Sequence, residues 1–136
     1  MRKILFRAKD EATGKWIYGY PVINDKGSLF MFEENSKEHN CYSCIKNTLG
    51  QYTSLNDKIG RRIFEGDIIK RIYVFNGVVD IIEIYKIIFI DGAFSYVAEN
   101  DDYSTYIYDS NFAIDIDDFE VIGNVHDNPE LQTNNL

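Results

Sequence analysis

The two cysteines of the chain stand three residues apart, as Cys41 and Cys44, and His39 precedes them. Thiolate and imidazole groups are ligands that zinc prefers, and a Cys-x-x-Cys pair can share one ion across a tight turn. A structural site needs about four ligands, and the only other histidine is His126. The pair does not open a helix of a thioredoxin-like unit, which disfavours redox chemistry. We therefore predict two ordinary thiols in a loop, with no metal and no cofactor.

Carboxylates form a second group that could carry chemistry. Asp115, Asp117 and Asp118 lie together, and Asp101 and Asp102 precede them. A calcium loop places its oxygen ligands at alternate positions around a glycine and ends in a glutamate. That pattern is absent, so we interpret these residues as a solvated acidic loop.

Glu65 and Asp67 flank Gly66, and we expect them to cap backbone N–H groups rather than to catalyse. A nucleophile triad needs a well-placed histidine, and neither histidine has a favourable context. The turn glycines are isolated and form no phosphate-binding loop; they are Gly14, Gly27, Gly60, Gly66, Gly77 and Gly92. We predict that the chain is not an enzyme.

Four basic residues surround the same turn: Arg61, Arg62, Lys70 and Arg71. Together with Tyr52 and Tyr73 they could clamp single-stranded nucleic acid, as small β-barrels do. Two neighbours on one strand point to opposite faces, however, and the cluster is small for a chain of net charge −8. Nucleic-acid binding is therefore an alternative that we disfavour.

Charge is unevenly distributed along the chain. Residues 1–70 hold 12 Lys/Arg and 9 Asp/Glu, which gives +3, and residues 71–136 hold 2 and 13, which gives −11. The simplest interpretation is solubility. The other interpretations are an electrostatic surface that faces a partner, or an acidic face that imitates DNA and blocks a host protein.

The chain has 136 residues, with ten Tyr, nine Phe and one Trp. This is enough for one domain, or for a core with a smaller appendage, and the composition is not that of a disordered protein. The sequence has no apolar run long enough for a transmembrane helix and no signal peptide. Two cysteines make no disulfide framework. We expect a cytoplasmic protein without membrane contact.

Hydrophobic alternation and turn signals predict a chain of short strands. Residues 1–8, 16–20 and 29–32 form a meander of hairpins, whereas the polar residues 33–47 are expected to form a loop. Later strands are predicted at 62–64, 68–75, 78–90, 93–97, 103–108 and 119–125.

Asn76-Gly77 and Asp91-Gly92 are strong hairpin signals. The strand between them, residues 78–90, is apolar on both faces. It should be buried on both sides, by a second sheet, by the N-terminal meander or by another subunit.

Residues 49–70 organise the chain, because two tight turns, at 56–60 and 65–67, redirect it here. We predict structural roles for seven residues of this stretch: Tyr52, Leu55, Asp57, Gly60, Glu65, Gly66 and Asp67.

The same stretch carries a family signature: Gly50-Gln51-Tyr52-Thr53, Leu55, Asp57, Gly60 and the run from Ile63 to Ile69. An opening segment (Ile4, Phe6-Arg7-Ala8 and Asp10) and a closing segment (Glu120 to Asn124 and Asn128 to Leu131) agree with it in order. On these residues the chain resembles the YopX family of bacteriophage and prophage proteins. Lys9 and Ser54 depart from the family pattern, which often has Trp and Gly there. The resemblance implies a phage origin and the host cytoplasm, and it carries over no catalytic residues.

We predict a mostly β protein, with a small SH3-like barrel and an N-terminal β-meander packed on or beside it. The segments are the meander and loop (1–48), the barrel core (49–128) and a C-terminal tail (129–136). The predicted function is a non-enzymatic phage accessory protein that binds a host or phage protein or assembles with itself. Oligomerisation would also cover the exposed sheet edges of such a fold.

Overall fold

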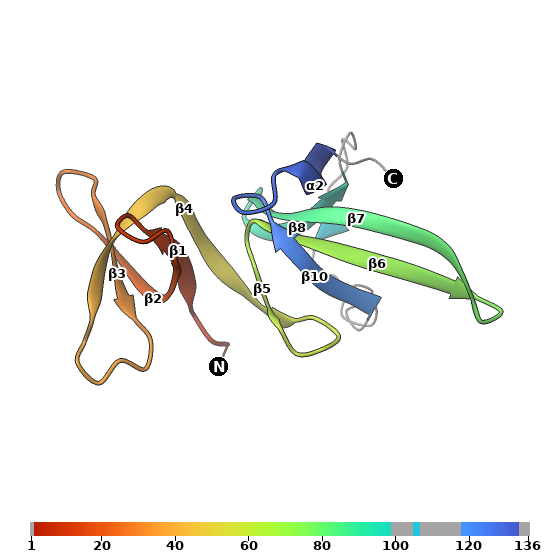
Figure 1. The fold of residues 1–136 in the computed structure, drawn as a ribbon, viewed down its shortest axis with the longest axis horizontal. Coiled ribbons are helices and arrows are strands. Elements are labelled where there is room, and N and C mark those ends of the chain that lie inside the picture. Colours follow the sequence, from red (N-terminus) through yellow and green to blue (C-terminus); the bar gives the residue numbers. More distant parts are fainter. Residues whose placement is uncertain (1, 99–104, 107–117, 134–136) are drawn as a thin grey trace. The chain divides into compact units, whose positions relative to one another are not determined.

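The computed structural model describes residues 2–98, 105–106 and 118–133. The chain forms two compact units, Met1–Tyr52 and Thr53–Leu136, which we describe separately. Almost all regular structure is strand (Figure 1), so the predicted mostly β fold is confirmed. The units divide within one long strand, and the boundary expected from the sequence, between residues 48 and 49, lies in that same strand.

The first unit contains β1 (Phe6–Asp10), β2 (Trp16–Ile23), β3 (Leu29–Glu33) and most of β4 (Cys41–Asn56). Successive strands pair antiparallel, and β1 also pairs with β4, so the four strands close into a ring. A Cβ at Gly19 would overlap the backbone carbonyl of Phe32 on the neighbouring strand. Only glycine therefore allows β2 and β3 to approach so closely here.

The core of this ring consists of Ala8, Leu29, Met31 and Cys44, and Phe6, Ile17, Tyr42 and Leu49 pack against it. Phe6 and Ala8 on β1, and Leu29 and Met31 on β3, are two residues apart and share the inner face, as expected for a curved sheet with one buried face.

The predicted loop over residues 33–47 is wrong in its second half, because Cys41 to Asn47 belong to β4. This part of β4 pairs with β3 on one side and with β1 on the other. Of its residues only Cys44 is fully buried. A strand with so few buried side chains has no visible hydrophobic period, which is why the sequence pattern missed it.

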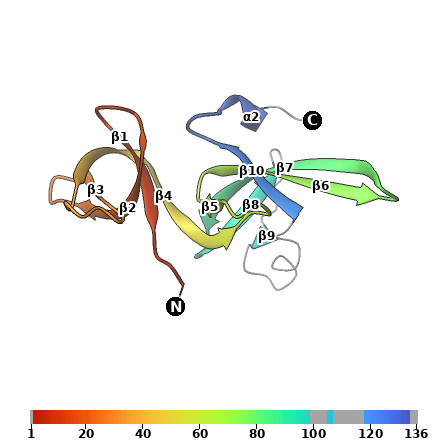
Figure 2. The same cartoon turned by 60° about the horizontal axis from the view of Figure 1, so that its bottom comes forward.

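The second unit contains β5 (Arg62–Phe64), β6 (Asp67–Phe75), β7 (Val78–Ile90), β8 (Ala93–Ala98), β9 (Thr105–Tyr106), β10 (Phe119–Asn124) and the short helix α2 (Glu130–Thr133). Its sheet has the order β10-β6-β7-β8-β9, with antiparallel neighbours (Figures 1 and 2). The sheet corresponds to the predicted barrel region, and β5 neighbours the end of β4.

Both predicted hairpins of this sheet are present. Asn76 and Gly77 have φ of 53° and 76°, and Asp91 and Gly92 have φ of 52° and 80°. Two consecutive positive φ values define the turn whose twist matches that of the paired strands. The predicted strand 103–108 is described only at β9, and the acidic residues Asp101, Asp102, Asp115 and Asp117 lie outside the described residues.

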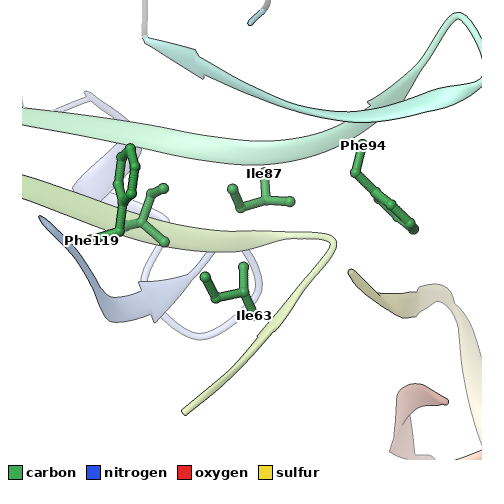
Figure 3. Packing of buried hydrophobic residues seen from close by; sticks show 5 residues of the cluster. Ile63, Ile87, Phe94 and Phe119 are labelled. Carbon is green, nitrogen blue, oxygen red and sulfur yellow. The ribbon is translucent and has the colours of Figure 1, made fainter. Parts of the chain in front are cut away.

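The core of the second unit lies between β5 and the sheet. It consists of Ile63, Ile69, Ile87, Phe94 and Phe119 (Figure 3), and Leu55, Tyr85, Tyr96 and Val121 pack against it. The rings of Tyr85 and Tyr96 meet edge to face, with centroids 4.7 Å apart. Five strands and the end of β4 thus contribute to one hydrophobic cluster.

Candidate functional site

Asp57 fixes the turn between β4 and β5. Its carboxylate accepts hydrogen bonds from the backbone N–H groups of Ile59 at 3.0 Å and Arg61 at 2.8 Å. The second oxygen accepts from the N–H of Val121 on β10 at 3.0 Å. The Asp57 side chain is buried, so the carboxylate is committed to holding the turn on the edge of the sheet.

Asp67 plays a similar part at the turn between β5 and β6. It is 1% exposed, and its carboxylate accepts from the N–H of Phe64 at 2.7 Å. Gly66, which precedes Asp67 in this turn, has a φ of +90°, a value that residues other than glycine rarely adopt. The N–H of Gly66 donates to the carbonyl of Ile87, and its carbonyl accepts from Val125, which ties the turn to the sheet.

The remaining residues of the organising stretch are also placed by the fold. Gly60 closes the Asp57 turn with a φ of +87°, and Leu55 packs against the core of the second unit. Tyr52 is buried, and its N–H donates to the carbonyl of Leu5. Glu65 is half-buried in the second turn. The carboxylates of Asp57 and Asp67 thus accept hydrogen bonds from the backbones of two different turns.

The basic cluster predicted from the sequence is spread out and paired. Lys70 and Arg71 lie on opposite faces of β6, because neighbouring residues alternate along a strand. The Lys70 ammonium lies 4.0 Å from the Glu120 carboxylate, and the Arg71 guanidinium lies 3.9 Å from that of Asp118. Arg61 donates to the carbonyl of Val121.

Arg62 lies half-buried on the short strand β5. The Arg71 guanidinium covers one face of the Tyr73 ring, with its carbon atom 4.3 Å from the ring centroid. Tyr52 is 7% exposed, so its ring is largely enclosed by its own unit.

The two cysteines face opposite sides of β4. Cys41 lies opposite Phe32 and is exposed, whereas Cys44 lies opposite Leu29 in the core. Residues three apart on a strand point away from each other, so these thiols cannot share one metal ion. Burial raises the pKa of the Cys44 thiol to about 11, and the charges of Asp10 and Glu11 add to the rise. Within the described ranges, no three metal-binding side chains come together.

The outer half of the β6–β7 hairpin stands apart from the rest of its sheet. Strand β10 pairs with β6 only from Asp67 to Arg71, and β8 pairs with β7 only from Tyr85 onward. Residues 72–82 therefore form a two-stranded ribbon that extends beyond its neighbouring strands (Figure 1). We call this segment the β6–β7 ribbon, and residues 74–79 its apolar tip.

The β6–β7 ribbon exposes five large apolar side chains: Val74 (62%), Phe75 (70%), Val78 (67%), Val79 (53%) and Ile82 (45%). Burial of β7 on both faces was predicted, and this is wrong. Of the described side chains of β7 only Ile87, which belongs to the core cluster, is buried. Phe89 and Ile90, at the other end of the strand, are 52% and 39% exposed. Nothing in the described chain covers the apolar tip.

The YopX family model, described as YopX protein, matches residues 5–132. This chain belongs to the YopX family. The match extends over most of both units, including the β6–β7 ribbon of the second unit, and it confirms the resemblance seen in the sequence.

A solved structure shares the fold of this YopX chain. It is the crystal structure of protein EF1440 from Enterococcus faecalis, with a TM-score of 0.61 and 24% identity over 97% of this chain and 99% of that one. At this identity the similarity shows the fold alone. No curated protein matches this chain. Among the described residues, no helix is long and apolar enough to cross a membrane.

Sequence reasoning did not single out the apolar tip of this YopX protein. The signal was present, because Val74-Phe75 and Val78-Val79 flank the Asn76-Gly77 turn, and residues 72–79 contain no charged side chain. An uncharged hairpin end differs from the polar loop tips that are usual at a protein surface.

Proposed function

We propose that this YopX-family chain is a non-enzymatic phage accessory protein that acts by binding protein through its β6–β7 ribbon. The observation that carries this proposal is the group of five exposed apolar side chains at the end of one ribbon. The pair Phe75 and Val78 lies on one face of the ribbon, and the pair Val74 and Val79 lies on the other. Single exposed apolar residues are normal on a protein surface, but several that gather at one hairpin end indicate an interaction site.

The charge of the chain favours protein over nucleic acid as the partner. Residues 72–82 carry no lysine or arginine and one acid, Asp80. At the base of the ribbon, Lys70 pairs with Glu120 of β10, and Arg71 pairs with Asp118, which directly precedes β10. Nucleic-acid binding depends on cations that neutralise phosphates, and this surface supplies none.

The non-enzymatic role is supported by the buried carboxylates. Asp57 and Asp67 accept backbone hydrogen bonds and hold turns that the core requires. A general acid or base must be able to reach a substrate proton, and these two groups are instead enclosed by the fold.

The test is affinity capture from host extract, with and without nuclease, using the tagged protein and the double variant Phe75→Asp/Val78→Asp. These residues lie opposite each other on the ribbon. The matched control is Ile23→Asp, at an apolar position of β2 that is 52% exposed. We expect bound protein to be lost from the ribbon variant only. Equal capture by all three proteins, or capture that nuclease abolishes, would overturn the proposal.

A further inference from the structure

We infer that Asn76, at the apolar tip, is a site of spontaneous deamidation. The pair Asn76-Gly77 forms the turn of the β6–β7 ribbon, and the reaction places a negative charge on a stretch, residues 72–79, that has no charged side chain. The modification depends only on the chain and on water. Its consequence for binding rests on the proposed function, because the ribbon is the proposed binding surface.

The reaction begins at the backbone nitrogen of Gly77. Once a hydroxide ion has removed its proton, this nitrogen attacks the side-chain carbonyl carbon of Asn76. A new C–N bond closes a succinimide ring, and the side-chain nitrogen takes up a proton and leaves as ammonia. Water then opens the ring at either of its carbonyl groups, which gives aspartate or isoaspartate. In sum, water is consumed and ammonia is released, with no oxidant or reductant.

The sequence favours this asparagine over the others. A side chain on the following residue would crowd the attacking nitrogen, and glycine has none. Asn76 is the only asparagine of the chain that is followed by glycine. Both residues of the pair are exposed, so hydroxide and water reach the reacting atoms. Among the described residues, the Asn76 carboxamide and the Gly77 N–H make no hydrogen bond.

Asn24 shows what protects a carboxamide in another exposed turn. Its Oδ1 atom accepts hydrogen bonds from the N–H groups of Lys26 at 3.0 Å and Ser28 at 2.9 Å. These bonds fix the carboxamide, and the residue that follows, Asp25, carries a side chain. Asn24 is therefore an internal control for Asn76, since both are exposed.

The end of the ribbon can open without the rest of the sheet. Between the turn and a register shift in the ladder lie only two cross-strand pairs, Val74 with Val79 and Phe75 with Val78. A shift of this kind disrupts the hydrogen bonds of the ladder locally. Local opening costs least where few contacts are broken. The turn can therefore reach the geometry in which the nitrogen and the carbonyl carbon meet.

The aspartate product keeps the turn. Asp91-Gly92 forms the β7–β8 turn with φ of 52° and 80°, against 53° and 76° for Asn76-Gly77. Aspartate therefore accepts the same backbone geometry, and Asn76→Asp reproduces the charge without loss of the hairpin. The isoaspartate product also inserts a methylene into the backbone, which changes the turn as well as its charge.

The new carboxylate lies among apolar side chains. Its neighbours Phe75 and Val78 are 70% and 67% exposed. A charge that enters an apolar contact without a partner must lose its water, which is costly. A deamidated tip should therefore bind its protein partner at least ~10-fold more weakly. The chain would lose binding with age, as the neutral tip is replaced by an acidic one.

The first experiment measures the reaction itself. The full chain is kept folded at mildly acidic and at mildly alkaline pH and then digested at acidic pH, and mass spectrometry follows each asparagine. We expect Asn76 to convert before Asn24, and faster at alkaline pH, with aspartate and isoaspartate resolved by chromatography. Asn76→Gly suits the same turn and should abolish the early release of ammonia. Conversion of Asn76 that is no faster than that of Asn24 overturns the inference.

The second experiment measures the consequence in the capture assay. Asn76→Asp should recover at least ~10-fold less bound protein than the unchanged chain, whereas Asn24→Asp, with the same charge in another exposed turn, should recover as much. Equal recovery by Asn76→Asp overturns the loss of binding. If the unchanged chain itself captures no protein, the proposed function fails, and the mass measurement still decides whether Asn76 is the site of deamidation.

Discussion

Replacing Asp57 with alanine tests the claim that one carboxylate holds the turn onto the sheet. The change leaves three backbone N–H groups, those of Ile59, Arg61 and Val121, without their acceptor. A hydrogen bond to a charged group contributes about 1.5–3 kcal/mol. The hydrogen bond of Val121, on β10, is partly buried, and we assign it about 2 kcal/mol. The two donors in the exposed turn can turn to water, and we assign them about 0.5 kcal/mol each.

The free energy of unfolding should therefore fall by about 3 kcal/mol, which for a unit of under 100 residues lowers Tm by about 15 °C. Urea unfolding followed by circular dichroism measures the loss, with the m-value as a check on the denatured state. Asp57→Asn keeps one acceptor oxygen and should lose about half as much. Asp25→Ala, at an exposed turn acid, is the control. A loss below about 0.5 kcal/mol for Asp57→Ala would refute the role given to this carboxylate.

Two further predictions concern backbone conformation and the buried thiol. Ser54 has a φ of +72° and Gly66 a φ of +90°, a conformation that costs less for glycine than for other residues. Ser54→Gly should therefore raise the free energy of unfolding by about 0.5–1 kcal/mol, and Gly66→Ala should lower it by about 1–2 kcal/mol. Equal Tm values for the two variants in calorimetry would contradict this. Cys41 should react with a thiol reagent in the folded chain, whereas Cys44 should react only on unfolding because it is buried. Mass spectrometry after digestion shows which of the two cysteines has been labelled. The unfolded chain ionises this thiol near pH 9.0 and the folded chain near pH 11, so its stabilising contribution is complete below pH 9 and is lost between these values. Cys44→Val should lack that part of the pH dependence, and an unchanged pH profile would argue against a buried neutral thiol.

Local rules predicted much of the second unit. Asn-Gly and Asp-Gly pairs fix the two hairpins because asparagine, aspartate and glycine accept positive φ. The organising stretch was recognisable because Asp57, Gly60, Gly66 and Asp67 each meet a backbone requirement that few other residues meet. The departure of Ser54 from the family glycine falls at a positive φ, which gives that glycine a physical reason.

Long-range pairing could not be predicted in the same way. The strand that includes Cys41 and Cys44 is visible only through its partners β1 and β3. Its sequence was interpreted as a loop with two ordinary thiols, whereas the two thiols lie on opposite faces of a strand. The basic residues near Arg71 looked like one cluster, whereas the sheet pairs them with Glu120 and Asp118, which lie about fifty residues away in sequence.

The predicted burial of residues 78–90 on both faces was the most informative error. Hydrophobic content alone indicates that a strand should be covered, but it does not say by what. The described chain covers Ile87 and leaves Val78, Val79 and Ile82 exposed. The sequence left open a second sheet, the N-terminal meander or another subunit as the partner that covers this strand.

The most direct test of the ribbon as a binding surface is amide hydrogen exchange of the full chain, alone and bound to the protein partner recovered by affinity capture. Residues 67–71 of β6 pair with both β7 and β10 and serve as an internal control that should not change. We expect the amides of residues 72–82 to exchange rapidly in the chain alone and to be protected in the complex. Exchange in the ribbon that is equally fast in both samples would contradict its role as the binding surface.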